Sequence, residues 1–311
     1  DGRLMIASDF GTWNRKDARH LLAPAALALG RDEWLSLAPE SAAWEAIWWG
    51  FDGSQFAPGQ IAPPDNVKLY PDAGAAISRT REGCRYLLVT NSIVGTKGFG
   101  NHKHNEQLSF EYHDEGTPLI VDPGSFVYTS DFEARNMFRS TAYHNTLAID
   151  GVEQNEFNPE WLFRMFEKAK PEHLLFEERD GVVVYEGLHR GYERLESPAT
   201  HRRRFTHDRR TGALSIEDQL TGEGEHDLLW SFHFHPAVRV ELSTGQLTIK
   251  AKSGAWTLAW FDLEASARLD ATWFSPSYGV RTPSTALRLE RRAAPVRNGH
   301  WRFEIKKKIG A

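Results

Sequence analysis

Two histidines separated by one residue, His102 and His104, are the residues whose types and spacing most directly suggest chemistry. On a β-strand, both imidazole rings would project from the same face. Asp122 ends an apolar run just before Pro-Gly, and His144 stands just before another apolar run. Two imidazoles with a carboxylate and a water molecule are a usual ligand set for Zn²⁺. The spacing therefore allows a zinc site built from these residues.

The His-x-His spacing is weak evidence when it is taken alone. It recurs at His233 and His235, which alternate with Phe232 and Phe234. That alternation favours one polar face of an ordinary strand. Spacing alone therefore leaves open the alternative that His102 and His104 bind no metal.

The elements that would position these residues change in character near residue 60. Before it, apolar residues at 21, 22, 25, 26 and 29 share one helical face, which predicts a helix over 17–29 with Gly30 as its C-cap. Ser41 is a suitable N-cap for a second helix over 42–49. The Pro- and Gly-containing stretch 56–64 is typical of a linker. Residues 1–60 therefore form a helical segment that is too small to be a domain by itself.

After residue 66 the sequence consists of short apolar or alternating runs, separated by turn dipeptides such as Asp180-Gly181 and Glu223-Gly224. Such spacing predicts a mainly β fold, a large antiparallel β-sandwich over 61–311. We expect an irregular, aromatic-rich loop over 155–166. The expected strands are Tyr86–Asn91, Leu108–His113, Leu119–Asp122, Thr146–Asp150, Val182–Tyr185, Ala213–Gln219 and Leu228–His235.

Composition excludes several classes of protein. The 311 residues have 41% hydrophobic content, so a large core rather than disorder is expected. A net charge of −5 and a pI near 6.2 give no nucleic-acid footprint. The one dense basic run, 201–204, is interpreted as a solvated strand face, with contact of Arg202 and Arg204 to an anionic polymer as the alternative. No apolar run is long enough to span a membrane, and Cys84 alone cannot form an internal disulfide.

Several motifs in order carry a family resemblance. They are Gly-x-His-x-His with Leu-Ser-Phe in 100–110, Val-Asp-Pro-Gly in 121–124, and Arg-Ser-Thr-Ala-x-His-Asn-Thr in 139–146. With the strand start Tyr-Pro-Asp-Ala-Gly in 69–79 and Ser-Asp-Phe-Gly at 8–11, the sequence resembles the heparinase II/III-like polysaccharide lyases. The resemblance is clear over 1–155. Beyond residue 155 the resemblance depends on strand-like runs and on His235-Pro236.

The resemblance implies an incomplete (α/α) toroid followed by an antiparallel β-sandwich. It also implies cleavage of uronic-acid polysaccharides by β-elimination, with His104, Asp122 and His144 as metal ligands. His102 matches the sandwich histidine that reaches into the catalytic cleft. Glu106 stands where the family more often has Asp. The implied metal is a single divalent ion with a structural role, Zn²⁺ in the first place and Ca²⁺ or Mn²⁺ as alternatives.

Supporting roles follow for Asn101, Arg139 and Asn145, which lie within or beside the matching motifs. Trp161, in the expected loop, could stack on a sugar ring. The tyrosines in strand-like runs, Tyr128 among them, are interpreted as packing residues. The resemblance implies that the proton-transferring tyrosine, and an Asn or His that neutralises the substrate carboxylate, come from the toroid. Because the chain opens on Asp1, not on Met, we expect an upstream toroid domain as its partner.

Three other functions remain open at this point. A metal-stabilised carbohydrate-binding module would need no lyase activity of its own. A member of an exopolysaccharide biosynthesis cluster would process polymer during export. A non-catalytic assembly protein would retain the metal ligands but not His102, which is present. For the lyase, we expect an anionic polysaccharide substrate and a periplasmic or secreted location in a bacterium.

Overall fold

The helical part of the chain is small. A computed structural model describes residues 21–38, 47–48, 50, 66–80, 84–297 and 299–308. Helix α1 (Leu22–Leu29) ends at Gly30, whose φ of 62° is left-handed and whose N–H donates to Ala26 O, so the expected C-cap is confirmed. A 3₁₀ helix, η2 (Asp32–Leu37), packs against α1 through Ala23 and Ala38. The first residues of the expected helix, most of the second helix, the linker and the boundary near residue 60 lie outside the described residues.

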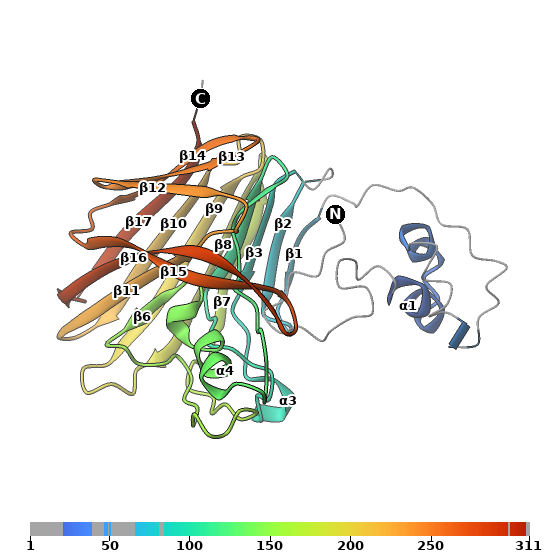
Figure 1. Cartoon of the computed structure of the whole chain (residues 1–311), viewed down its shortest axis with the longest axis horizontal. Helices are drawn as coiled ribbons and strands as arrows, with labels where there is room; N and C mark the ends of the chain where they lie inside the picture. Colours follow the sequence, from blue (N-terminus) through green and yellow to red (C-terminus); the bar gives the residue numbers. More distant parts are fainter. Residues whose placement is uncertain are drawn as a thin grey trace.

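The β-rich part forms three antiparallel sheets (Figure 1). The first sheet is a meander of five strands in sequence order. Its strands are β1 (Asn66–Tyr70), β2 (Ala75–Arg79), β3 (Tyr86–Thr90), β4 (Ser109–Asp114) and β5 (Thr117–Ile120).

The second sheet has eight strands in the order β12-β13-β14-β17-β10-β9-β8-β7. Its strands are β7 (Glu172–Arg179), β8 (Val182–Tyr192), β9 (Ala199–Asp208), β10 (Leu214–Gly222), β12 (Arg239–Ser243), β13 (Gln246–Ala251), β14 (Gly254–Phe261) and β17 (Gly299–Lys307).

The third sheet has four strands in the order β15-β16-β11-β6. Its strands are β6 (Leu147–Ile149), β11 (Glu225–His233), β15 (Ser266–Ser277) and β16 (Val280–Pro295). A bridge between Ile120 and Phe234 connects the first and third sheets at the ends of β5 and β11. The predicted mainly β, antiparallel sandwich is confirmed, and every expected strand overlaps an observed one.

One apolar core joins the sheets because residues of alternating character line their inner faces. Phe110, Phe205, Trp230, Trp256 and Phe303 are fully buried in it. Burying one such side chain contributes about 1.5–3 kcal/mol relative to leaving it exposed. The turn glycines after the acidic residues 115, 180 and 223 have φ near 72–79°, a region that favours glycine, so the predicted hairpin turns are confirmed.

The connections that carry the predicted site gather at one end of the sandwich, the lower end in Figure 1. They include three short helices, α3 (Gly95–Gly98), α4 (Phe132–Phe138) and η4 (Thr141–Tyr143). The expected loop 155–166 contains no strand and only an isolated bridge between Glu156 and Phe166. Within the described part of the chain, no helix is long and apolar enough to cross a membrane.

Candidate active site

Asn145 is the residue that ties the site segments to the sheets. Its side-chain amide donates to Phe110 O and Val121 O, both at 2.9 Å, and its Oδ1 accepts from His233 N at 2.6 Å. The Ser109 hydroxyl accepts from the Asn145 N–H at 3.0 Å. Asn145 is fully buried. One side chain therefore fixes the ends of β4, β5 and β11 around His144.

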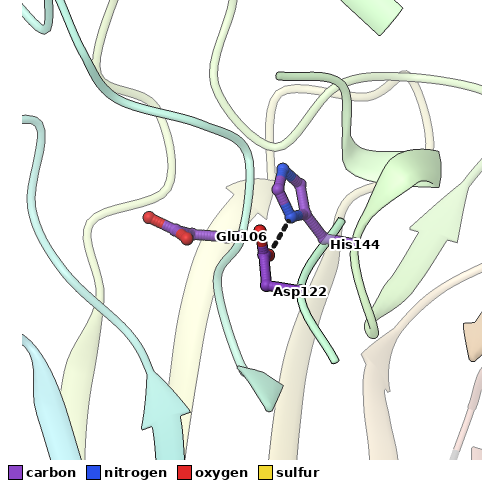
Figure 2. A group of neighbouring side chains, drawn as sticks. All are labelled: Glu106, Asp122 and His144. Carbon is purple, nitrogen blue, oxygen red and sulfur yellow. Dashed lines mark hydrogen bonds and ion pairs between the residues drawn. The ribbon is translucent and has the colours of Figure 1, made fainter. Parts of the chain in front are cut away.

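Asp122 and His144 form the centre of the site. Asp122 Oδ1 accepts from Gly124 N at 2.8 Å, which holds the carboxylate just beyond β5. Its Oδ2 lies 2.7 Å from His144 Nδ1 (Figure 2). Burial disfavours the charged imidazole, but the Asp122 carboxylate outweighs this effect and raises the pKa of His144.

Glu106 completes the group that could hold a metal ion. Ligand atoms of Glu106, Asp122 and His144 lie within 4.8 Å of one another, with Glu106 on the neighbouring loop before β4 (Figure 2). Glu106 also pairs with Lys103 Nζ at 3.4 Å, so this carboxylate has a competing partner. Carboxylates with an imidazole are donors that suit a divalent cation.

His104 lies beside this group but does not belong to it. Its ring centroid is 5.3 Å from that of His144, and its Nε2 lies 2.7 Å from Arg135 Nη1. Burial, then Arg135 and His144, lower the pKa of His104 well below its usual value, so the ring is neutral. Among the described residues, buried His104 Nδ1 and His144 Nε2 have no hydrogen-bond partner. Such unsatisfied nitrogens fit a metal ion or another ligand, and the assignment of His104 as a ligand stays a prediction.

His102 points to different neighbours from His104. The expectation that both rings share one strand face is wrong, because both residues lie in the loop between α3 and β4. The half-buried His102 ring lies edge-on to Tyr128 and Phe163, with centroids 5.3 and 6.2 Å away. Desolvation and then the Arg135 cation lower the pKa of His102. At neutral pH its imidazole is therefore neutral and able to accept a proton.

Arg135 and Tyr128 lie beside His102; the sequence did not identify Arg135 and indicated only packing for Tyr128. Arg135 is fully buried, and its guanidinium lies 4.9 Å from the Tyr128 ring centroid and 3.4 Å from Asn101 O. No carboxylate among the described residues pairs with it, and burial lowers its pKa to about 10. The only signal was the spacing of Arg135 and Arg139 by four residues, which places them on one helical side. Spacing does not reveal that the side is buried.

Arg139 organises the loop that follows β6. Its guanidinium donates to four carbonyls of this loop, at 3.2–3.5 Å, and lies 4.0 Å from the Phe157 ring centroid. Burial, then Arg135, lower the pKa of Arg139 to about 10. The loop carries Phe163, which contacts His102, and Trp161, which is 54% exposed. The four carbonyls belong to Asn158, Trp161, Leu162 and Arg164.

Of the remaining residues, Asn101 lies in the site loop, and Tyr143 and His233 lie in the core. Asn101 Oδ1 accepts from the Thr96 hydroxyl at 3.0 Å. Tyr143 is a buried core residue, and its hydroxyl accepts from Trp273 N at 2.9 Å. His233 is buried against Tyr143, with ring centroids 5.1 Å apart, so its expected polar strand face is not solvent-exposed.

The basic run on β9 alternates between two environments, so the predicted solvated face is only half right. Arg202 and Arg204 point outward and both pair with Glu186. His201 and Arg203 point into the sandwich and are fully buried. The strand period of two explains the split.

The fold and these contacts define the class of protein: an antiparallel β-sandwich with a carboxylate–imidazole centre at one end. The family model described as "Heparinase II/III-like, C-terminal" matches residues 62–304. The chain therefore belongs to the heparinase II/III-like family and contains its C-terminal region. No curated protein shows significant sequence similarity to the chain.

Three solved structures share the fold. Heparan sulfate lyase HepC from Pedobacter heparinus superimposes with a TM-score of 0.69 at 16% identity, covering 95% of this chain and 43% of that protein. The structure named heparinase III gives 0.68 at 16% identity, covering 93% and 43%. The heparinase III–BT4657 gene product gives 0.67 at 18% identity, covering 93% and 42%. The chain thus spans less than half the length of these proteins.

Proposed function

We propose that this chain is the sandwich half of a polysaccharide lyase that cleaves a uronic-acid-containing polysaccharide by β-elimination. The observation that carries the proposal is His102, a neutral imidazole beside a tyrosine at the open end of a heparinase II/III-like sandwich. The names of the solved structures, a heparan sulfate lyase and heparinase III, support the same chemistry for this chain.

β-Elimination requires a base and an acid on either side of one sugar linkage. The base removes the proton at C5 of the uronate, the electron pair forms the C4–C5 double bond, and the bond from C4 to the leaving oxygen breaks. An acid then protonates that oxygen. His102 serves as the base, because its lowered pKa keeps it unprotonated. Tyr128, edge-on to His102, is the tyrosine of this chain that could protonate the leaving oxygen.

The negative charge that develops on the uronate carboxylate needs stabilisation. Arg135 is a buried cation that lies behind His102 and Tyr128 without a carboxylate partner among the described residues. A fixed positive charge in a low-dielectric site favours such a transition state without touching the substrate. Asn101 lies beside His102 and offers an amide. By the family resemblance, further neutralising and proton-transferring groups come from an upstream toroid domain.

The metal in this proposal is one divalent ion, Zn²⁺ before Ca²⁺ or Mn²⁺. Glu106, Asp122 and His144 would hold it, with His104 at the adjacent position. When bound, it would fix the loop before β4 to the segment that carries His144 and so orient His102. Its role is structural.

The loop with Trp161 forms the substrate-facing side of the proposal. Trp161 stacks on a sugar ring of an anionic polysaccharide. Arg139 holds the loop that carries Trp161, and Asn145 holds the strand ends around His144. The proposal includes a periplasmic or secreted location in a bacterium, where a polymeric anionic substrate is accessible.

The test is absorbance of the unsaturated uronate product during incubation with a panel of glycosaminoglycans and polyuronates. This chain and a version extended upstream are compared, each with His102→Gln and Tyr128→Phe. Activity in the extended protein that is lost with His102→Gln supports the proposal. Activity that survives His102→Gln contradicts the assignment of the base.

A carbohydrate-binding module is the second candidate. It is favoured by the exposed Trp161. Binding of the polymers measured by calorimetry, together with no product from either version of the protein, would support this function instead. Trp161→Ala should then weaken binding.

A further inference from the structure

A fully buried ion pair lies in the sandwich beneath the site. Arg203 on β9 and Asp218 on β10 face each other in register. Arg203 Nε and Nη2 each donate to one carboxylate oxygen of Asp218 at 2.7 Å. The same carboxylate accepts from His201 Nε2 at 2.6 Å and from Trp230 Nε1 at 3.0 Å. All four hydrogen bonds fix the plane of the carboxylate, and through it the plane of the guanidinium.

The remaining nitrogen of Arg203 bridges the two segments of the site. Nη1 donates to Leu108 O and to Asn145 O, both at 2.9 Å. Leu108 closes the loop that carries His102, His104 and Glu106, and its φ of 56° turns the chain into β4. Asn145 directly follows His144. One nitrogen therefore sets the separation between the two backbones that present the site residues.

A second set of contacts ties the same loop to the same ion pair. Gln107 N donates to Gln154 Oε1 at 2.8 Å, and Gln107 O accepts from Gln154 Nε2 at 3.1 Å and from the Thr146 hydroxyl at 2.7 Å. Gln154 Nε2 lies 3.4 Å from His189 Nε2, which lies 3.2 Å from His201 Nδ1. The contacts thus run from the site loop through two buried histidines to Asp218.

Stability alone is a poor explanation for this network. Desolvating an ion pair offsets its attraction, and apolar residues of similar volume often replace such pairs without loss of stability. The surrounding core, with Phe110, Phe205 and Phe232, is apolar and could accept such residues. What apolar residues could not supply is a donor to Leu108 O and Asn145 O together.

We propose that Arg203 is a positioning residue of the active site, which fixes the His102–Gln107 loop relative to His144 through the carbonyls of Leu108 and Asn145. Asp218 orients the guanidinium for this task. The catalytic consequence rests on the proposed lyase function, while the structural consequence does not.

The experiment compares Arg203→Lys and Arg203→Met with Arg204→Met, a control on the same strand that points outward. Arg203→Lys keeps a positive charge beside Asp218, so this variant should still fold. A single ammonium, however, cannot contact the Asp218 carboxylate and both carbonyls at once. Hydrogen exchange is measured on the 311-residue chain. Arg203→Lys should exchange at least about tenfold faster at 105–109 and 144–147, with β13 and β14 unchanged within about twofold. Arg203→Met leaves Asp218 as an unpaired buried charge, which is strongly destabilising, so it serves as the reference for general destabilisation, with faster exchange in all sheets. The control should match the wild type.

Equal acceleration of β13 and β14 in Arg203→Lys would mean that Arg203 stabilises the fold generally, and unchanged exchange in Arg203→Lys would mean that the bridge is dispensable. Either result overturns the proposal. In the uronate assay, Arg203→Lys should lower kcat at least about tenfold and change KM less than about threefold. This assay uses the upstream-extended protein. If the extended wild type has no activity on any polymer, the lyase function fails, and the exchange result still decides the role of Arg203.

Discussion

Replacing Arg139 by methionine tests whether one guanidinium shapes the loop 157–164. The substitution keeps an apolar stem over Phe157 and removes every donor to the loop carbonyls. Leu162 O is the acceptor at a fully buried contact, and leaving it unsatisfied costs about 1–3 kcal/mol. The other three carbonyls are partly buried and regain water, so we expect a total of about 2–4 kcal/mol. A domain of ordinary stability, about 5–15 kcal/mol, survives such a loss.

The loop should therefore open while the sandwich remains folded. A change of 2–4 kcal/mol corresponds to roughly 30- to 800-fold in the opening equilibrium. The amides of Trp161 and Arg164 donate to Asn158 O and Trp161 O within the loop, so their hydrogen exchange reports its opening directly. With an active protein, KM for the polymer should rise more than kcat falls, because the loop carries Trp161.

The matched control is Arg190→Met, an exposed arginine paired with Glu172 and Glu193 away from the loop. It should leave the exchange of the loop amides unchanged. The reasoning is refuted if Arg139→Met leaves the Trp161 and Arg164 amides as protected as in the wild type. Arg139→Lys should give an intermediate effect, because one ammonium reaches fewer carbonyls than a planar guanidinium.

Three further predictions concern catalysis, metal binding and pH. His102→Gln should lower kcat by about 10²–10⁴-fold with Tm unchanged, since general base catalysis typically contributes that much. A folded variant that keeps wild-type activity would refute this role. Zn²⁺ at about 100 times its Kd should raise the Tm of chelator-treated protein by roughly 5 °C, because binding adds about 2.7 kcal/mol, and Asp122→Asn should abolish the shift. Burial, then Arg209 and Arg85, lower the pKa of His207 to about 4, so the unfolded chain binds its proton first. His207 alone should contribute a loss of about 3 kcal/mol of stability as pH drops from about 6.5 to about 4, and urea titrations of His207→Gln should show a profile flatter by about that amount.

The strands were predictable because burial on one face imposes a period of two. Ala199 to Asp208 and Leu214 to Gly222 follow this alternation, and Gly212 lies in the turn between them. The same period explains why the run at 201–204 was only half right. Sequence identifies that adjacent residues face opposite ways, but it does not say which face is the interior when both carry charge.

The site was harder to predict, because its loops are shaped by contacts distant in sequence. His102 and His104 follow no strand geometry, since their loop is fixed by Asn105 N donating to Arg139 O and by Gln154. Local propensity contains no information on such contacts. Asp122 and His144 were placed together by motif order, and the short distance between their side chains is consistent with that expectation.

Buried cations at this end of the sandwich connect fold and proposed substrate. Arg135 and Arg139 have no ion-pair partner in the described part of the chain, and burial lowers the pKa of both. Burying a charge without an ion pair costs several kcal/mol, which Arg139 offsets through its hydrogen bonds to the loop carbonyls, whereas Arg135 contacts a neutral imidazole and one carbonyl, Asn101 O. Arg203 differs because Asp218 neutralises it, and it acts through backbone carbonyls instead. The Arg135 cation beside His102 favours an anionic ligand there. An acidic polysaccharide would supply the missing negative charge, which is the physical reason to test polyuronates and sulfated polymers before neutral ones.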